Sequence, residues 1–356
     1  MAGGGTGGHL FPALAVADEV RTINPRAVLW FVGTKRKIEA RVVPAQGYEF
    51  RTIWISGFHR SLRLENLLFP LKVLVSLVQS FFLIKQFRPD VAVGTGGYVC
   101  GPILAVASLL GIPTVVHESN SYPGVTTRML SGRATRVFTA FDATNRWLKK
   151  TDNIERVGTP TRDSLDGASK DEASRHFGLD LQKKTVLVVG GSLGAASINK
   201  TIGRIAGVLR QRNSQLIWQT GQSDFQRMKG SFEGQALGWI GAFIDRMDLA
   251  FAAADLVVSR SGATTIAELT RIGKAAILIP FPFAAADHQT FNAKALTDAG
   301  AAVLIPDREL DERLEQELIR LLNDDVKRIS MATACKSLGN PNAGKIVAGK
   351  ILGFIR

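Results

Sequence analysis

Two glycine-rich turns in the sequence are suited to binding phosphate, and each leads into a segment with helical spacing. The first covers residues 3–8 and is followed by His9; the second covers residues 190–194. Glycine lets backbone N–H groups at the start of a helix approach a phosphate closely, and an imidazole there could take a proton near neutral pH. No lysine follows the first turn, which excludes the Walker motif of NTPases. The alternative to phosphate binding, judged from these residues alone, is a tight structural turn followed by a histidine that only packs or forms a hydrogen bond.

Polar side chains follow other apolar runs of the second half. Residues 259–268, SRSGATTIAE, open a predicted helix with small and hydroxyl side chains that leave room for phosphate. Glu268, one turn later, could accept both hydroxyls of a ribose, and the amides of Gln289 and Asn292 could bind sugar hydroxyls. The alternative to this nucleotide-binding interpretation is a serine that merely caps the helix, with Glu268 exposed to solvent.

The first half shows the same arrangement. Residues 94–98, GTGGY, and 117–120, HESN, end two further apolar runs. Polar groups thus gather at the carboxyl ends of predicted strands in both halves, where open α/β sheets bind their ligands. We therefore expect a ligand cleft between two domains.

The elements that must position these residues follow a βαβ rhythm, in which short Val/Ile/Leu-rich runs alternate with glycine turns and helical segments. The sequence predicts an α/β protein of two Rossmann-like, doubly wound parallel-sheet domains. Strands are expected at residues 28–32, 91–94, 114–117, 136–139, 185–189, 215–219, 256–259, 276–279 and 302–304, with helices between them.

The domain boundaries follow from the turns. We expect an N-terminal domain over residues 1–157, a C-terminal domain over residues 158–338, and a last helix within residues 339–356 that packs back on the N-terminal domain. The first glycine loop begins at residue 3, so a strand of about six residues is expected to be missing before it, with a native start upstream of Met1.

Composition excludes several protein classes. The 356 residues are 46% hydrophobic and 21% charged, which excludes a disordered or collagen-like chain. Cys100 and Cys335 form no CxxC pair, so neither a disulfide framework nor a zinc site is predicted. The N-terminal residues lack the basic and apolar regions of a secretory signal, and we expect a cytosolic protein.

Charge indicates a polyanionic partner. The net charge is +13, and residues 1–157 alone hold 19 Lys/Arg against 10 Asp/Glu. Basic residues do not interleave with aromatic ones as in RNA-binding modules, so no nucleic acid is expected. Anionic lipid is the other candidate.

Residues 67–84 form the most apolar segment, LLFPLKVLVSLVQSFFLI. Polar positions 72, 76, 79 and 80 make one stripe on a predicted helix, and basic residues flank it between positions 60 and 88. A crossover helix packed on the sheet and a helix lying on an anionic bilayer both fit, and the two are compatible.

Taken together, the motifs GGTGGH-x-x-P, GTGGY, HESN, GGSLGA and SRSGATTIAEL resemble the MurG family. These are family 28 glycosyltransferases of GT-B fold, which transfer N-acetylglucosamine (GlcNAc) from UDP-GlcNAc to lipid I, undecaprenyl-diphospho-MurNAc-pentapeptide. The match runs in order from Gly4 to about residue 305. The resemblance implies synthesis of lipid II for peptidoglycan, and with it roles in cell-wall biogenesis, cell shape and division.

The resemblance also implies which residues bind the donor. The backbone of Ile244 would hold uracil and Glu268 the ribose, while Arg162 would supply a cation to the diphosphate. The full implied donor set is Thr6, Gly7, Gly8, Asn120, Arg162, Ser192, Ile244, Ala263, Thr264, Thr265, Ile266, Ala267, Glu268 and Gln289.

For the acceptor, the resemblance implies that Gly96, Gly97 and Tyr98 hold the diphosphate, with His9 or Glu118 as the base. A base deprotonates the acceptor hydroxyl, which attacks the anomeric carbon opposite UDP with inversion. No DxD-like acidic pair occurs near these turns, so we expect chemistry without a metal or cofactor. The implied partners are UDP-GlcNAc, lipid I and an anionic membrane surface at residues 60–88; other cell-wall synthesis proteins are further candidates. The implied location is peripheral, on the cytoplasmic face of the bacterial inner membrane.

Three alternatives differ from this interpretation. Another UDP-sugar enzyme of the same fold, such as a lipid glycosyltransferase or a UDP-GlcNAc 2-epimerase, would differ in its acceptor. A membrane scaffold without turnover would use the glycine loops merely as turns. A dehydrogenase would need a G-x-G-x-x-G loop and an acidic residue at the end of the second strand, and neither is found.

Overall fold

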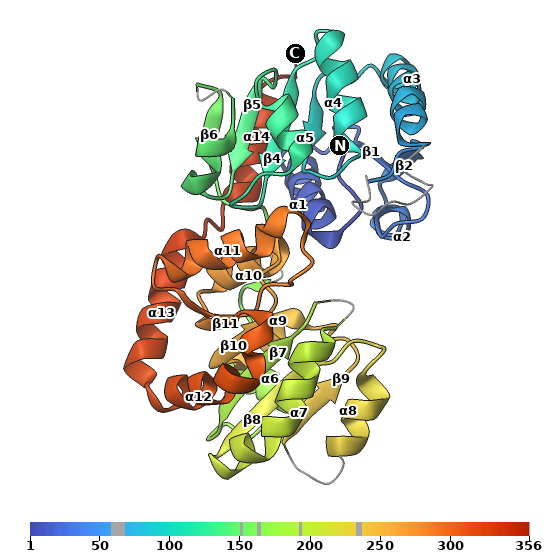
Figure 1. Cartoon of the computed structure of the whole chain (residues 1–356). Coiled ribbons are helices and arrows are strands. Elements are labelled where there is room, and N and C mark those ends of the chain that lie inside the picture. The colour runs from blue at the N-terminus through green and yellow to red at the C-terminus, as the bar shows by residue number, and fades with distance from the viewer. Residues whose placement is uncertain (58–67, 150–151, 162–164, 192–193, 233–236, 356) are drawn as a thin grey trace. The chain divides into compact units, whose positions relative to one another are not determined.

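The computed structural model describes residues 1–57, 68–149, 152–161, 165–191, 194–232 and 237–355. The chain divides into two compact units (Figure 1). Unit 1 comprises Met1–Arg162 and Asn340–Arg356, and unit 2 comprises Asp163–Gly339. Each unit is built around parallel strands.

Among the described residues of unit 1, every strand pairing is parallel. The strands are β1 (Trp30–Gly33), β2 (Glu49–Thr52), β3 (Ala92–Gly94), β4 (Thr114–Glu118), β5 (Arg136–Thr139) and β6 (Ile154–Arg156). β1 pairs with β2, and β3 to β6 pair in sequence order, with Ala92 opposite Thr114 and Val115 opposite Arg136.

Met1 and Ala2 lie between β1 and β3, at the place where a strand was expected to be missing. Ala2 forms parallel bridges to both Val32 and Gly94. Its N–H donates to the carbonyl of Val93 at 2.7 Å, and the N–H of Val32 donates to the carbonyl of Met1 at 2.9 Å. These two residues therefore join β1 and β3 into one surface and carry the chain into the glycine loop.

Helices cover both faces of this surface (Figure 1). The helices of unit 1 are α1 (Gly7–Ile23), α2 (Glu39–Ala45), α3 (Phe69–Phe87), α4 (Cys100–Leu109), α5 (Val125–Leu130), the 3-10 turn η2 (Asp142–Trp147) and α14 (Ala343–Leu352). Strand side chains alternate between faces: Val116 and Val137 pack with α3 and α4, whereas Val115 and Phe138 pack with α1 and α14. The C-terminal helix α14 contacts α1 along this second face.

Unit 2 contains a six-stranded parallel sheet in its described residues, in the order β12-β11-β10-β7-β8-β9. The strands are β7 (Lys184–Val189), β8 (Ser214–Gln219), β9 (Gly238–Gly241), β10 (Leu256–Ser259), β11 (Ala276–Leu278) and β12 (Ala302–Leu304). The order reverses between β7 and β10, where Val189 lies opposite Ser259. Such a reversal is the place where doubly wound sheets bind ligands.

The core of unit 2 lies between its sheet and the helices α7 and α12. Ile198 and Ile205 of α7 and Leu314 and Leu318 of α12 pack on Trp218 and other buried strand residues. The helices of unit 2 are α6 (Lys170–Phe177), α7 (Ala196–Gln211), α8 (Phe225–Phe232), α9 (Met247–Ala253), α10 (Ala263–Ile272), α11 (His288–Thr297), α12 (Leu310–Asn323) and α13 (Asp325–Leu338), with 3-10 turns η4 (Ala285–Asp287) and η5 (Asp307–Glu309).

The expected strands are confirmed to within two residues at each end. Three short strands, β2, β6 and β9, were missed. β2 and β6, EFRT and IER, carry charged residues, and β9, GWIG, is glycine-flanked. Edge strands of this kind lack the continuous apolar run by which buried parallel strands are recognised.

The orientation of α3 is the reverse of an ordinary packed helix. Its polar residues Ser76 and Ser80 are fully buried, whereas Leu74 and Phe82 are 60% and 65% exposed. The prediction that this helix packs on the unit is confirmed by its contact with α4. The polar stripe faces inward beside Ile84, however, whereas Leu74 and Phe82 face outward.

Candidate active site

The first glycine loop packs tightly against its neighbours in unit 1. A Cβ on Gly3 would lie 2.2 Å from Oγ1 of Thr95, and one on Gly4 would lie 2.7 Å from Oε1 of Glu39. Gly5 has a φ of +88°, which favours glycine. The run of glycines is therefore required by close approach and backbone conformation.

His9 lies in the first turn of α1, which begins at Gly7 after the extended residue Thr6. Its Nδ1 is 3.2 Å from the carbonyl oxygen of Gly4 and 3.3 Å from Oγ1 of Thr6. Thr95 Oγ1 donates to the His9 carbonyl at 2.7 Å. A carbonyl only accepts, so Nδ1 carries a proton and, in the neutral ring, the basic lone pair is on Nε2.

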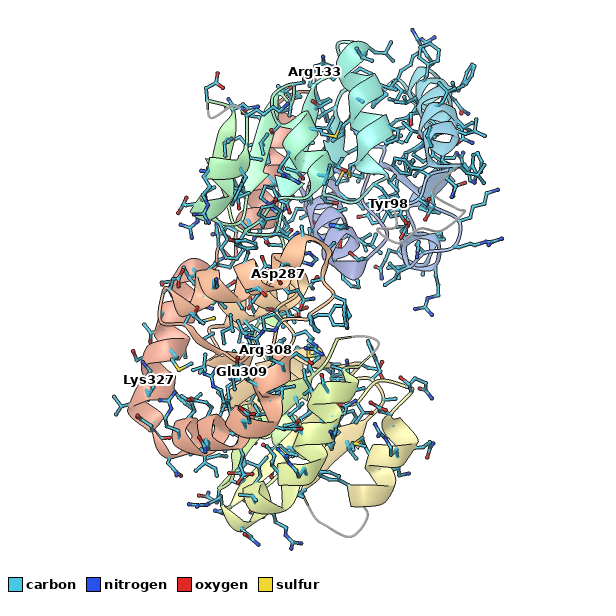
Figure 2. The ribbon with its side chains drawn as sticks, in the orientation of Figure 1. Tyr98, Arg133, Asp287, Arg308, Glu309 and Lys327 are labelled. Atoms are coloured by element: carbon cyan, nitrogen blue, oxygen red, sulfur yellow. The ribbon has the colours of Figure 1, made fainter. Side chains whose placement is uncertain are left out.

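The loop after β3 lies directly against His9. Gly96 and Gly97 have φ values of +108° and +84°, and a Cβ on Gly96 would lie 2.5 Å from Cδ2 of His9. The ring of Tyr98 covers Gly5, since a Cβ there would lie 3.2 Å from its Cε1; Figure 2 labels Tyr98. The structure thus brings together the acceptor residues predicted from the sequence and one of the two candidate bases.

Glu118, the other candidate base, organises the loop that follows β4. Its Oε1 accepts from the backbone N–H of Asn120 at 3.0 Å and from the Asn120 amide at 2.9 Å. Its Oε2 accepts from the backbone N–H of Gly124 at 3.0 Å and from Oγ1 of Thr127 at 2.7 Å. Each oxygen of this buried carboxylate therefore has two donors.

His117, next to it, holds the segment that leaves unit 1. It is fully buried, and its Nε2 lies 2.9 Å from the carbonyl oxygen of Gly158. Burial lowers the pKa of His117, opposed by the hydrogen bond to Gly158 and by the charge of Glu118. The ring is thus kept neutral.

In unit 2, the glycine turn after β7 also requires glycine. A Cβ on Gly194, whose φ is +80°, would lie 2.1 Å from the carbonyl oxygen of Thr220. Gln219, at the end of β8, donates from Nε2 to the carbonyl of Gly191 at 2.9 Å. Ser192, predicted to contact the donor, lies outside the described residues, as does Arg162.

The helix α10 begins at the carboxyl end of β10, next to this turn. Gly262 precedes it without a side chain, and the N–H groups of its first turn have no acceptor within the helix. Oγ1 of Thr264 is buried and has no hydrogen-bond partner in the described part of the chain. The side chains of Ile266 and Ala267 pack inward, whereas Thr265 and Glu268 are half-buried. A helix N-terminus beside a buried, unpaired hydroxyl suits an anionic ligand.

Ile244 was expected to hold uracil through its backbone. Its side chain is buried, and its N–H donates to Oε1 of Gln219 at 2.9 Å. Gln219 therefore links the predicted uracil position to the glycine turn. No role was predicted for Gln219 from the sequence, although a polar residue at the end of an apolar strand is an available signal.

Gln289 lies in the first turn of α11. Its Oε1 accepts from the N–H of Phe281 at 2.9 Å, and its carbonyl accepts from Oγ of Ser261 at 2.8 Å. Ala286 and Asp287, just before it, have φ values of 53° and 54°, which are unfavourable for residues with a Cβ. This strained turn sets the direction of the α11 N-terminus.

Arg260 connects several loops of unit 2 through hydrogen bonds. No role was predicted for it from the sequence. Its guanidinium donates to the carboxylate of Asp307, to Oγ of Ser197 at 2.9 Å and to the carbonyl of Pro280 at 3.2 Å. Ser197 lies in the first turn of α7, which follows the glycine turn, and Pro280 precedes the loop to Gln289. Within the described residues, no three His, Cys, Asp or Glu side chains are grouped to hold a metal ion.

Comparison with known proteins gives a consistent result. Residues 1–139 match the glycosyltransferase family 28 N-terminal domain, and residues 185–345 match the family's C-terminal domain. A Flavobacterium psychrophilum protein named UDP-N-acetylglucosamine--N-acetylmuramyl-(pentapeptide) pyrophosphoryl-undecaprenol N-acetylglucosamine transferase is 43% identical over 100% of this chain and 97% of its own length. The crystal structure of Acinetobacter baumannii MurG aligns with a TM-score of 0.78 and 30% identity over 99% of this chain and 98% of that one. A UDP-GlcNAc 2-epimerase from Neisseria meningitidis, 13% identical with a TM-score of 0.67 over 96% and 97% of the two chains, shares the fold alone.

Proposed function

Because this chain belongs to glycosyltransferase family 28, we propose that it is the inverting transferase that moves GlcNAc from UDP-GlcNAc to lipid I, forming lipid II for peptidoglycan. The observation that carries this proposal is the 43% identity, over the whole chain, with a relative named for that reaction. The local geometry of each unit supports a separate part of the chemistry.

Unit 2 has the features required of the donor site. The first turn of α10, whose leading N–H groups have no acceptor within the helix, lies at the switch point of the sheet, beside the buried hydroxyl of Thr264. Negative charge develops on the UDP diphosphate as the glycosidic bond breaks, and preorganised N–H donors stabilise it most in that state. Glu268, which lies farther along the same helix, would accept the ribose hydroxyls. Arg162 would add a cation to the diphosphate.

In unit 1, His9 is better suited than Glu118 to act as the base. Its Nδ1 is oriented by the Gly4 carbonyl, which leaves the lone pair of the neutral ring on Nε2. Glu118, in contrast, accepts four hydrogen bonds from the loop that carries Asn120, and protonating it would weaken those bonds.

We propose that the sugar is transferred in a single displacement step. Nε2 of His9 takes the proton of the acceptor hydroxyl as that oxygen bonds to the anomeric carbon of GlcNAc. The bond from that carbon to the β-phosphate oxygen breaks on the opposite face, so the configuration inverts and UDP leaves with the electron pair. The loop of Gly96, Gly97 and Tyr98 would hold the acceptor's diphosphate beside His9.

We further propose that the enzyme binds the cytoplasmic face of the bacterial inner membrane through α3. By length and composition alone, this helix is long and apolar enough to cross a membrane. Its burial of Ser76 and Ser80 against the unit, with Leu74 and Phe82 outward and Lys85 and other basic residues alongside, supports binding parallel to the surface.

A transfer assay tests the proposed function. The purified protein is given UDP-GlcNAc labelled in the sugar, with lipid I or diacylglycerol in mixed micelles as acceptor. We expect label in lipid II only. Transfer to diacylglycerol alone would instead support a different lipid glycosyltransferase, and acceptor-independent formation of UDP-ManNAc would support an epimerase. No turnover with bound UDP-GlcNAc would favour a scaffold.

A further inference from the structure

We propose that Glu39 is a positioning residue that holds two loops of unit 1, residues 3–8 and residues 96–98, in the shape that receives the acceptor. This inference rests on the proposed function, because that function places the acceptor hydroxyl at His9, which follows the first loop, and the acceptor diphosphate at the second. Glu39 begins α2, and its side chain is fully buried beneath the first of those loops.

The carboxylate of Glu39 accepts three hydrogen bonds from two loops. Its Oε2 accepts from the N–H of Gly5 at 3.0 Å. Its Oε1 accepts from the N–H of Thr34 at 3.1 Å and from the hydroxyl of Thr34 at 2.9 Å. A buried carboxylate is stable only when it is hydrogen-bonded, so these donors and the carboxylate hold one another in place.

The network extends to the second acceptor loop through Thr34. The Tyr98 hydroxyl interacts with the side chain of Thr34, and the Tyr98 ring covers Gly5, whose N–H is already held by Glu39. Burial raises the pKa of Tyr98, the bond with Thr34 opposes that shift, and the charge of Glu39 adds to it. Glu39, Thr34, Tyr98 and Gly5 thus form a closed set of contacts that joins the two loops.

The charge of Glu39 argues for a role in shape. A carboxylate beneath a diphosphate site is electrostatically unfavourable for the substrate, and it directs the Gly5 N–H inward, away from any ligand. Glycine is the residue with the most backbone freedom, and the loop contains five glycines within residues 3–8. A strong acceptor under the loop is what restricts it to one conformation.

The test replaces Glu39 by glutamine. Because Oε1 is held by two Thr34 donors, the new amide NH₂ takes the Oε2 position and meets the Gly5 N–H, donor against donor. We expect kcat/KM for lipid I to fall roughly 10- to 100-fold, the loss typical of a buried hydrogen bond to a charged group, with a raised KM for lipid I. The Kd for UDP should change much less, because its uracil and ribose contacts are proposed in unit 2. Amide hydrogen exchange in residues 3–8 should become faster.

Two further variants complete the design. Glu49→Gln makes the same change at an exposed residue of the same unit, paired with Arg51, and should behave as wild type. Thr34→Val keeps the carboxylate, its bond to the Gly5 N–H and its bond to the backbone N–H of residue 34, but it removes the hydroxyl that donates to Oε1 of Glu39 and links to Tyr98. We therefore expect a smaller loss, on the order of fivefold in kcat/KM. If Glu39→Gln does not fold by circular dichroism, Thr34→Val decides the question with the same measurements.

A folded Glu39→Gln protein with wild-type KM for lipid I and wild-type exchange in residues 3–8 would overturn the proposal. A Glu39→Gln protein that only melts at a lower temperature, with unchanged KM for lipid I and unchanged exchange, would also overturn the proposal, because it would show a purely structural role. Absence of transfer by the wild-type enzyme would instead reject the proposed function, and the exchange measurement would still decide whether Glu39 holds the loop.

Discussion

The outward apolar face of α3 gives a quantitative prediction for membrane binding. Replacing Leu74 and Phe82 together by serine should sharply weaken binding to anionic vesicles, because most of each side chain is exposed on the surface of the unit. Since neither belongs to a buried core cluster, the double variant should stay folded with only a modest loss in the free energy of unfolding.

The magnitude follows from the exposed fractions. Burying a whole Leu or Phe side chain contributes about 1.5–3 kcal/mol. Leu74 is 60% exposed and Phe82 is 65% exposed, so each has about 1–2 kcal/mol left to gain from the bilayer. The two together amount to about 2–4 kcal/mol, which corresponds to a roughly 30- to 800-fold lower partition coefficient.

Sedimentation with phosphatidylglycerol-containing vesicles, at several salt concentrations, measures this coefficient. Val28→Ser is the matched control, because Val28 is 71% exposed in the same unit but lies outside α3. The reasoning is refuted if the double variant partitions within a few-fold of wild type, or if Val28→Ser weakens binding equally.

Three other predictions concern the interior of each unit. His9→Gln should lower kcat by about 10²- to 10⁴-fold without destabilising the protein. Glu118→Gln should instead lower the free energy of unfolding by about 1–3 kcal/mol, because an NH₂ group then faces hydrogen-bond donors. Steady-state kinetics and urea denaturation measure the two effects, and the reverse pattern would make Glu118 the base. Gly194→Ala should lower the affinity for UDP, measured by calorimetry, because its Cβ would lie 2.1 Å from the Thr220 carbonyl oxygen; wild-type affinity would contradict the tight turn. Burial lowers the pKa of His117, so below the ordinary value of 6.5 the unfolded chain binds more protons than the folded one. The free energy of unfolding should therefore decrease as the pH is lowered below 6.5, by up to about 1.4 kcal/mol per pH unit, until the pKa of His117 in the folded protein is reached. His117→Gln should lose this slope, and an identical slope in both proteins would contradict the assignment.

Much of the fold could be predicted because apolar runs and glycine turns are local signals. Val186 and Val188 belong to an uninterrupted apolar run, which buried parallel strands require, and the structure places them in the core of unit 2. Gly96 and Gly194 mark places where a Cβ would collide with a neighbour. Among the described residues, positions 95–98 directly follow β3, positions 119–120 follow β4 and positions 260–262 follow β10.

The direction of α3 could not be predicted from periodicity. A polar stripe on a helix normally faces water, but Ser76 and Ser80 satisfy their hydroxyls within the helix itself. Ser76 Oγ donates to the carbonyl of Val73 at 2.8 Å, and Ser80 Oγ donates to that of Ser76 at 2.7 Å. With the hydroxyls satisfied, burying these small residues is inexpensive in free energy and lets the helix approach its unit closely.

The buried charged residues also lay beyond sequence reasoning, for a related physical reason. Glu39 lies in the segment TKRKIEA, which has the composition of a solvated charge run, and its partners Gly5 and Thr34 are assembled only by the fold. Arg260 likewise finds Ser197 and Asp307 far along the chain. In both units a charged side chain tethers the loops around a glycine turn. Glycine gives such a turn room for a phosphate but also the largest conformational entropy to lose on binding. A buried charge that orders the turn before the substrate arrives removes that loss from the binding step, so tight binding and a glycine-rich loop become compatible.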